Sequence, residues 1–153
     1  MALPSGPYSV FDTESIVDIV KRTLHEVFDT NEWASLLNTT VTIVETSQAE
    51  ITSYPAVWAF VSGYIPTGAL MARKKMHNTE FTLNVEVYTQ IANDMTKEQI
   101  NSKMRRQIHE ALAENYGFSL TSATQVPSTN VGVERWRMTF GNTQDNFTKI
   151  IYK

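Results

Sequence analysis

Apolar residues recur at helical spacing in the first part of the chain. Six of them lie three or four residues apart and form one stripe: Ile16, Ile19, Val20, Leu24, Val27 and Phe28. Asp12 and Thr13 precede this stripe, and both are good N-cap residues. The pattern predicts an amphipathic helix that begins near residue 12 and buries one face.

A second helix is marked by its ends as well as by its apolar stripe. Thr96 and Gln99 have the spacing of a capping box, and Gly117 can adopt the left-handed conformation that ends a helix. Between them a buried stripe is predicted from Ile100, Met104, Ile108, Ala111 and Leu112. We expect Phe118 to fold back over the last turn.

Short runs rich in β-branched and aromatic residues predict strands. The predicted strands are residues 41–45, 56–62, 81–88, 119–126, 131–140 and 147–152. Residues 56–62 are apolar on both faces, so we expect a central strand that is covered on both sides. Residues 81–88 alternate between apolar and polar, as half-buried strands do. Val131 and Val133 are out of phase with the apolar positions that follow, which predicts a bulge near Glu134 or Arg135.

The order helix, strands, helix, strands is typical of an α+β fold. We expect a mostly antiparallel β-sheet with two main α-helices packed on one face, forming a single domain over residues 12–153. Residues 1–11 contain Pro4, Gly6 and Pro7 and are predicted to form an extended N-terminal arm. Because large apolar groups rarely project into water from a tail, Tyr8 and Phe11 are predicted to dock on a partner.

The composition is that of a folded globular protein, with 42% hydrophobic and 19% charged residues in a chain of 153. A net charge of −3 argues against an extended nucleic-acid footprint. The charge is distributed unevenly, at −6 over residues 1–69 and +3 over residues 70–153. This asymmetry reflects either which faces are solvated or head-to-tail packing between copies.

The sequence offers no pattern of residues for catalysis, metal binding or cofactor binding. The absence of cysteine excludes disulfides, thiol nucleophiles and thiolate metal sites. His25, His77 and His109 are interpreted as surface or boundary residues without a ligating partner on their own face. Glu134 and Arg135 are adjacent in a strand and should point to opposite faces. We therefore predict that the protein is not an enzyme and has no cofactor, and no apolar run is long enough for a membrane span.

Residues 66–79 join two predicted strands and form the most unusual segment. Three basic residues, Arg73, Lys74 and Lys75, are flanked here by Met71 and Met76. Fourteen residues exceed the usual length of a hairpin loop. Two interpretations remain: a surface loop with solvated charges, or a loop that orders on assembly or contacts passing DNA without sequence specificity.

The order of elements resembles the tail-terminator (tail-completion) family of tailed phages. The resemblance covers residues 12–153 and is carried by Tyr54-Pro55-Ala56-Val57-Trp58-Ala59-Phe60, by Phe81-Thr82-Leu83-Asn84-Val85-Glu86-Val87-Tyr88 and by Gly117-Phe118. It implies a structural virion protein of the tail or neck, assembled in the host cytoplasm. Its subunits would form a homohexameric ring that ends tail-tube growth and surrounds a DNA channel.

The partners implied by the resemblance are further copies of the chain, the tail-tube protein, a head-side connector or neck protein, and DNA in transient contact. The family offers no catalytic residues, and its pattern has no counterpart to the arm at residues 1–11. Three alternatives remain open: another neck or connector ring protein, a stand-alone bacterial α+β binding module, and an enzyme with an unrecognised site.

Overall fold

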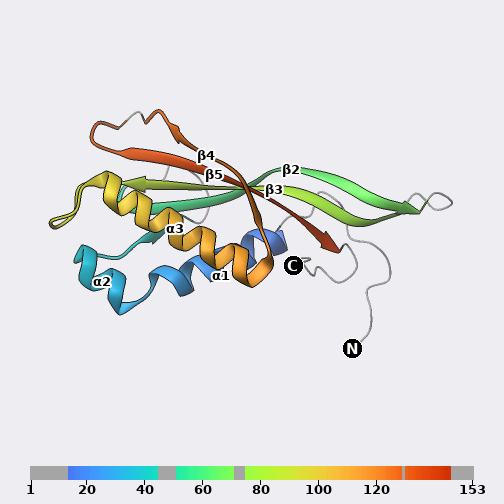
Figure 1. The fold of residues 1–153 in the computed structure, drawn as a ribbon, viewed down its shortest axis with the longest axis horizontal. Coiled ribbons are helices and arrows are strands. Elements are labelled where there is room, and N and C mark those ends of the chain that lie inside the picture. The colour runs from blue at the N-terminus through green and yellow to red at the C-terminus, as the bar shows by residue number, and fades with distance from the viewer. Residues whose placement is uncertain (1–13, 45–50, 71–74, 129, 146–153) are drawn as a thin grey trace.

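The computed structural model describes residues 14–44, 51–70, 75–128 and 130–145, and the fold is drawn in Figure 1. These residues form three helices and five strands. In chain order the elements are α1 (Glu14–Phe28), α2 (Asn31–Leu37), β1 (Thr42–Ile43), β2 (Ala56–Leu70), β3 (Lys75–Thr89), α3 (Lys97–Tyr116), β4 (Ser119–Val126) and β5 (Glu134–Asp145). The predicted arm at residues 1–11 and the predicted strand at residues 147–152 lie outside the described residues.

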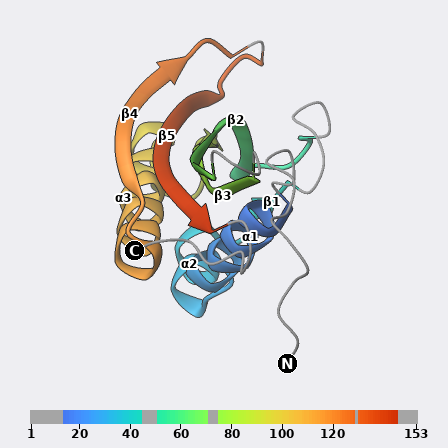
Figure 2. The ribbon, with the colours of Figure 1, turned by 90° about the vertical axis from the view of Figure 1, so that its right-hand side faces the viewer.

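The five strands form one sheet in the order β1-β2-β3-β5-β4. The short strand β1 runs parallel to β2, and all other neighbours are antiparallel. All three helices pack on the same side of this sheet, as Figure 1 shows. The predicted α+β class with a mostly antiparallel sheet is therefore confirmed. Figure 2, which looks along the long axis, shows β4 and β5 as strongly curved strands at one side of the sheet.

The hydrophobic core lies between the helices and one face of the sheet. Most of both predicted helical stripes is buried there, in one cluster with Phe81, Leu83, Val85 and Val87 of β3: Ile16, Val20, Leu24 and Phe28 of α1, and Ile100, Met104, Ile108 and Leu112 of α3. Ile19, Val27 and Ala111 are half-buried. The capping box of α3 is present: Gln99 N donates to Thr96 Oγ1 and Thr96 N donates to Gln99 Oε1. Gly117 ends the helix at a φ of 67°, and the buried ring of Phe118 folds back as predicted.

The structure contains a third helix, α2, that the sequence analysis missed. Thr30 caps its first turn through its hydroxyl, which accepts from the backbone N–H of Trp33. Trp33 and Leu37 are four residues apart, and both are buried against the core. A helix of seven residues has room for only two such anchors, so its apolar period is too short to stand out from the sequence.

The prediction of a long loop at residues 66–79 is wrong for most of these residues. β2 continues to Leu70 and β3 starts at Lys75, so these residues extend a hairpin whose far end runs past the helices in Figure 1. Thr67 pairs with Asn78, and Ala69 pairs with Met76. No helical layer packs on this part of the hairpin, so its strands need no alternation of apolar and polar residues. Many of its residues are small or polar, and the sequence therefore resembles a loop.

The bulges are also placed differently from the prediction. β5 pairs with β3 without interruption from Glu134 onwards, and Val131 and Val133 precede the strand instead of belonging to it. The register shifts lie between Val61 and Gly63 in β2 and between Leu120 and Ser122 in β4. The shift in β2 exchanges the two faces, because Val61 pairs with a core-facing residue and Gly63 pairs with a residue on the opposite face.

The prediction that residues 56–62 form a central strand covered on both sides is wrong in both respects. The centre of the sheet is β3, and β2 is the second strand from the edge. Val57 and Ala59 face the core, whereas Trp58 and Phe60 are half-buried on the face that lacks helices. Conversely, the polar side of β3 is more buried than its alternation predicts, since Asn84, Glu86 and Tyr88 are all buried.

Candidate functional site on the open face of the sheet

The face of the sheet opposite the helices, here called the open face, carries a grid of polar and aromatic side chains. The pairing register defines its rows across β2, β3, β5 and β4. One row contains Trp58, Glu86, Arg137 and Thr124, and the next contains Phe60, Asn84, Thr139 and Ser122. No helix of the described residues covers this grid, so its side chains shield each other.

Glu86 is the centre of the open face. Its side chain has no exposed surface, and its carboxylate accepts hydrogen bonds from three residues. Arg135 donates two hydrogen bonds to the carboxylate, from Nε to Oε1 at 2.6 Å and from Nη2 to Oε2 at 3.1 Å. Tyr88 Oη donates to Oε1 at 3.1 Å, and Arg137 Nη2 lies 3.5 Å from Oε2. We call these four residues, Glu86, Tyr88, Arg135 and Arg137, the arginine cluster.

The arginine cluster also perturbs its tyrosine. Burial raises the pKa of the Tyr88 hydroxyl well above its ordinary value of 10.0, and the neighbouring Glu86 carboxylate raises it further. Tyr88 therefore stays protonated and remains a hydrogen-bond donor to Glu86 over the whole physiological range.

Arg137 is the least satisfied member of the arginine cluster. Its side chain is 40% exposed, compared with 14% for Arg135, and its contact with Glu86 is the longest of the four. Its Nε is buried and has no hydrogen-bond partner among the described residues. Because two guanidinium groups share one carboxylate, the cluster carries a net positive charge. The surplus charge belongs to Arg137, whose exposed part can meet a negatively charged group from outside, whereas its buried Nε cannot.

Aromatic side chains border the arginine cluster on β2. The rings of Trp58 and Phe60 are stacked with centroids 4.2 Å apart, and the Arg137 guanidinium lies 5.9 Å from the Phe60 centroid. On the other side of Phe60, Asn84 donates to Ser62 Oγ at 2.6 Å and accepts from Thr139 Oγ1 at 3.1 Å. The open face thus joins half-buried aromatic rings to a fixed polar network.

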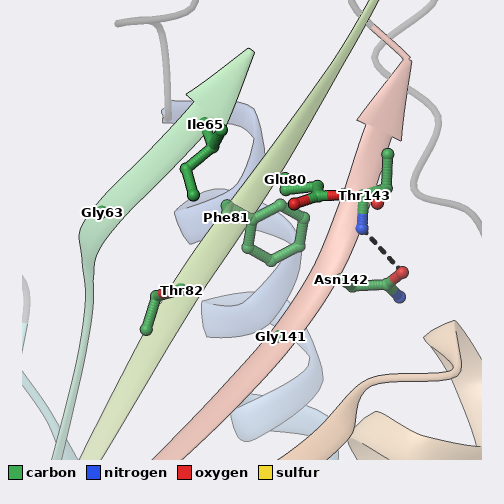
Figure 3. Close-up of a pocket in the computed structure, with 8 residues that line it drawn as sticks. All are labelled: Gly63, Ile65, Glu80, Phe81, Thr82, Gly141, Asn142 and Thr143. Carbon is green, nitrogen blue, oxygen red and sulfur yellow. Dashed lines mark hydrogen bonds between the residues drawn. The ribbon is translucent and has the colours of Figure 1, made fainter. Parts of the chain in front are cut away.

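A shallow groove of about 440 Å³ lies further along the sheet and is lined by residues of β2, β3 and β5. Its floor is a row of small residues, Gly63, Thr82 and Gly141, which are paired neighbours on three strands. Figure 3 shows Ile65 and Glu80 at its rim, and both are exposed. A Cβ at Gly63 would meet nothing within 4 Å, so the missing side chain there leaves room for a group from outside the protein.

A second polar network lies on the helical side of the sheet and is structural. Asn101 is fully buried, donates to Val87 O at 3.1 Å and accepts from Arg105 Nε at 2.7 Å. The Arg105 guanidinium stacks 3.7 Å from the centroid of Trp136, and burial lowers its pKa. Trp136 Nε1 in turn donates to Glu134 Oε1 at 3.0 Å. These bonds connect α3 to the start of β5, with Asn101 and Glu134 buried and Arg105 and Trp136 half-buried.

Few of the residues that the sequence analysis singled out can be located in the structure. Tyr8, Phe11, Met71, Arg73 and Lys74 lie outside the described residues. Lys75 and Met76 belong to strand β3 and not to a loop. Their proposed roles in docking, assembly and DNA contact remain predictions.

The interpretation of His25 needs a correction. Asp29 lies on the same face of the chain one turn later, and the His25 Nδ1 atom is 2.8 Å from Asp29 Oδ2. This partner is four residues away, whereas the prediction was based on the adjacent Glu26 alone. The pair is exposed, and among the described residues no group of three or more potential ligands could hold a metal ion.

The arginine cluster itself was missed, although Glu134 and Arg135 do point to opposite faces as predicted. The available signal was the pair Arg135 and Arg137, two basic residues on one face of a strand, together with Glu86 at a polar position of another strand. Only the register, which places Glu86 opposite Arg137, brings the three together.

In the described part of the chain, none of the helices has the length and apolar character needed to cross a membrane.

No protein-family model matches the chain, and none of the curated proteins does. Among solved structures, the chain is similar to the bacteriophage SPP1 gp17 protein, with 15% sequence identity and a TM-score of 0.34. The similarity covers 84% of this chain and 92% of the gp17 chain. A likeness at this TM-score supports no inference about function.

Proposed function

We propose that this chain is a structural subunit that assembles with copies of itself into a ring at the head-proximal end of a phage tail. The ring, most simply of six copies, would end growth of the tail tube and join the tail to a head-side connector, with DNA passing through its centre. The resemblance of residues 12–153 to the tail-terminator family motivates the proposal. The virion is then the place where the protein acts.

The observation that carries the proposal is the surplus positive charge of Arg137 on an open, partly aromatic sheet face. Arginine, tryptophan and tyrosine are enriched at protein–protein interfaces and account for much of their binding energy. Here Trp58 and Phe60 are half-buried beside the guanidinium of Arg137, whose side chain is 40% exposed. A carboxylate on a neighbouring subunit would satisfy that group and exclude water from the aromatic pair.

The same geometry favours assembly over catalysis. Glu86 is the buried carboxylate at the centre of the open face, and its two oxygens already accept from donors of Tyr88, Arg135 and Arg137. A general base needs a lone pair that faces the substrate. Because Tyr88, Arg135 and Arg137 occupy both oxygens of Glu86, the arginine cluster holds its shape and presents positive charge through Arg137.

The test compares two variants of Arg137 in the full-length chain. Arg137→Gln removes the surplus charge while Arg135 and Tyr88 still hold Glu86, so the fold should remain intact. We expect self-association, or joining to purified tail tubes, to weaken by about tenfold or more, as for loss of an interface arginine. Arg137→Lys keeps the charge and should retain part of the activity. Arg106→Gln, an exposed arginine on α3, is the matched control and should assemble normally.

Mass in solution decides the broader proposal. Sedimentation and native mass spectrometry should detect species that are multiples of the 17.3 kDa subunit, either alone or after contact with tail tubes. A concentrated sample that stays monomeric and does not join tubes would refute the proposal and favour a stand-alone binding module. Binding to connector complexes but not to tail tubes would instead identify another ring of the neck.

A further inference from the structure

The outer edge of β4 is a second surface with no partner in the described structure. β4 is the last strand of the sheet and pairs only with β5, which leaves the backbone N–H and C=O groups of its other edge available. Six of its eight residues are exposed, so both of its faces as well as its edge meet solvent. An unpaired edge of this kind is a template for an added strand.

Natural sheets usually protect such edges, and β4 lacks the common devices. Edge strands are commonly blunted by lysine, by proline or by being very short. β4 contains no charged residue and no proline over its eight positions. Its register shift lies near its start, between Leu120 and Ser122, and the rest pairs regularly with β5. At the opposite edge β1 covers only Ala56 and Val57 of β2, so in the described structure β4 is the edge that is open along its whole length and β2 is open only beyond Val57.

The chain itself supplies a segment that matches this edge. Residues 1–11 carry no charged side chain, and residues 8–11 are Tyr, Ser, Val and Phe, three of which favour strands. Pro4 and Pro7 lack a backbone donor and restrict pairing to the residues that follow them. An uncharged strand edge and an uncharged donor can pair without desolvating an ion.

The position of α1 indicates that donor and acceptor belong to different copies. α1, which follows the arm, packs against β1, β2 and α3, whereas β4 lies at the other edge of the sheet. The proposed donor, residues 8–11, ends three residues before Glu14, so even Tyr8 lies within about 20 Å of the start of α1 when the chain is extended. An arm that leaves on the β1 side meets the β4 edge of an adjacent subunit in a head-to-tail arrangement, which is the contact that closes a ring.

We propose that β4 of one subunit accepts residues 8–11 of the next subunit as an added strand. This inference rests on the proposed ring for the identity of the partner, and on the β4 edge for the site. Backbone hydrogen bonds would hold the arm, while Tyr8 and Phe11 would select its register.

The experiment uses the full-length chain, diluted until monomeric, with a synthetic peptide of residues 1–13 as the probe. Amide hydrogen exchange should slow by about tenfold or more in β4 and stay unchanged in β1 and α3. Peptides that are N-methylated at residue 9 or at residue 10 separate strand addition from side-chain docking. In an added strand alternate N–H groups face the acceptor, so one of these two peptides should lose binding and the other should keep it.

The outcomes separate this inference from the proposed function. A chain that forms rings without protecting β4, and that still assembles as a Tyr8→Asp, Phe11→Asp variant, would overturn the inference and leave the ring intact. A chain that never assembles but binds the peptide along β4 would support the receptive edge and overturn the ring. Equal binding by both N-methylated peptides would overturn strand addition.

Discussion

Replacing Glu86 by Gln should destabilise the protein more than any other single change of charge on the open face. The substitution keeps the shape of the side chain but removes the only negative charge among the arginine cluster. The Gln amide group can accept at one position only, so at least one of the donors from Arg135 is left unpaired. Arg135 is 14% exposed and cannot reach water without rearranging the sheet face.

The expected cost follows from the burial of each partner. Removing one member of a buried ion pair costs about 3–5 kcal/mol, because the other charge stays buried without compensation. Arg137 is 40% exposed, so it can turn towards solvent and contributes little to this cost. We therefore expect Glu86→Gln to lower the free energy of unfolding by about 3 kcal/mol, the low end of that range.

Urea unfolding followed by circular dichroism measures this change directly. Glu98→Gln is the matched control, since Glu98 is exposed and its loss should change stability by no more than about 0.5 kcal/mol. The double variant Glu86→Leu, Arg135→Met removes both buried charges and should recover much of the loss. If Glu86→Gln costs less than about 1 kcal/mol, the cluster is hydrated in solution and the reasoning fails.

Two further predictions concern other buried polar groups. The stability that Tyr88 contributes should be fully present below pH 10 and should fall as the pH rises further, because the native state holds the Tyr88 proton at a pKa raised above the ordinary value of 10.0. Thermal melting of Tyr88→Phe against pH should lack this component, and an unchanged alkaline decline would contradict the assignment. Asn101→Leu should cost about 2–3 kcal/mol, because it leaves Arg105 Nε and Val87 O without a buried partner. A denaturation midpoint within error of the wild type would show that water replaces the amide.

The sequence predicted those elements that carry a complete local signal. α3 has a capping box, an apolar stripe of several turns and a terminal glycine, so its ends were predicted almost to the residue. β4 was predicted with its observed bounds. The local signal is too weak where tertiary packing determines the structure, as in α2. Two apolar residues are enough to hold this helix, because they pack against Phe28 and the core.

The open face could not be predicted for a different reason. The polar positions of residues 81–88 indicate solvent when β3 is considered alone, yet Asn84 and Glu86 are buried. Their burial depends on neighbours from β2 and β5, which lie more than twenty residues away in the sequence. Alternation predicts which residues share a face, but only the register determines which charges meet.

The register shift between Val61 and Gly63 has a consequence for how the protein tolerates changes of length. Before the shift, odd-numbered residues of β2 face the core; after it, Gly63 and Ile65 face the opposite side, which is why Ile65 is 63% exposed. Two-residue insertions or deletions placed symmetrically beyond this point lengthen or shorten the hairpin while every side chain keeps its orientation. The outer hairpin can therefore diverge between relatives, or be grafted by design, without any change in the core. A deletion of Ser62 alone would remove the extra residue, so Gly63 and the residues after it could keep their partners on β3 in a regular ladder. A single-residue deletion beyond the shift would instead reverse the faces of the residues on one side of it.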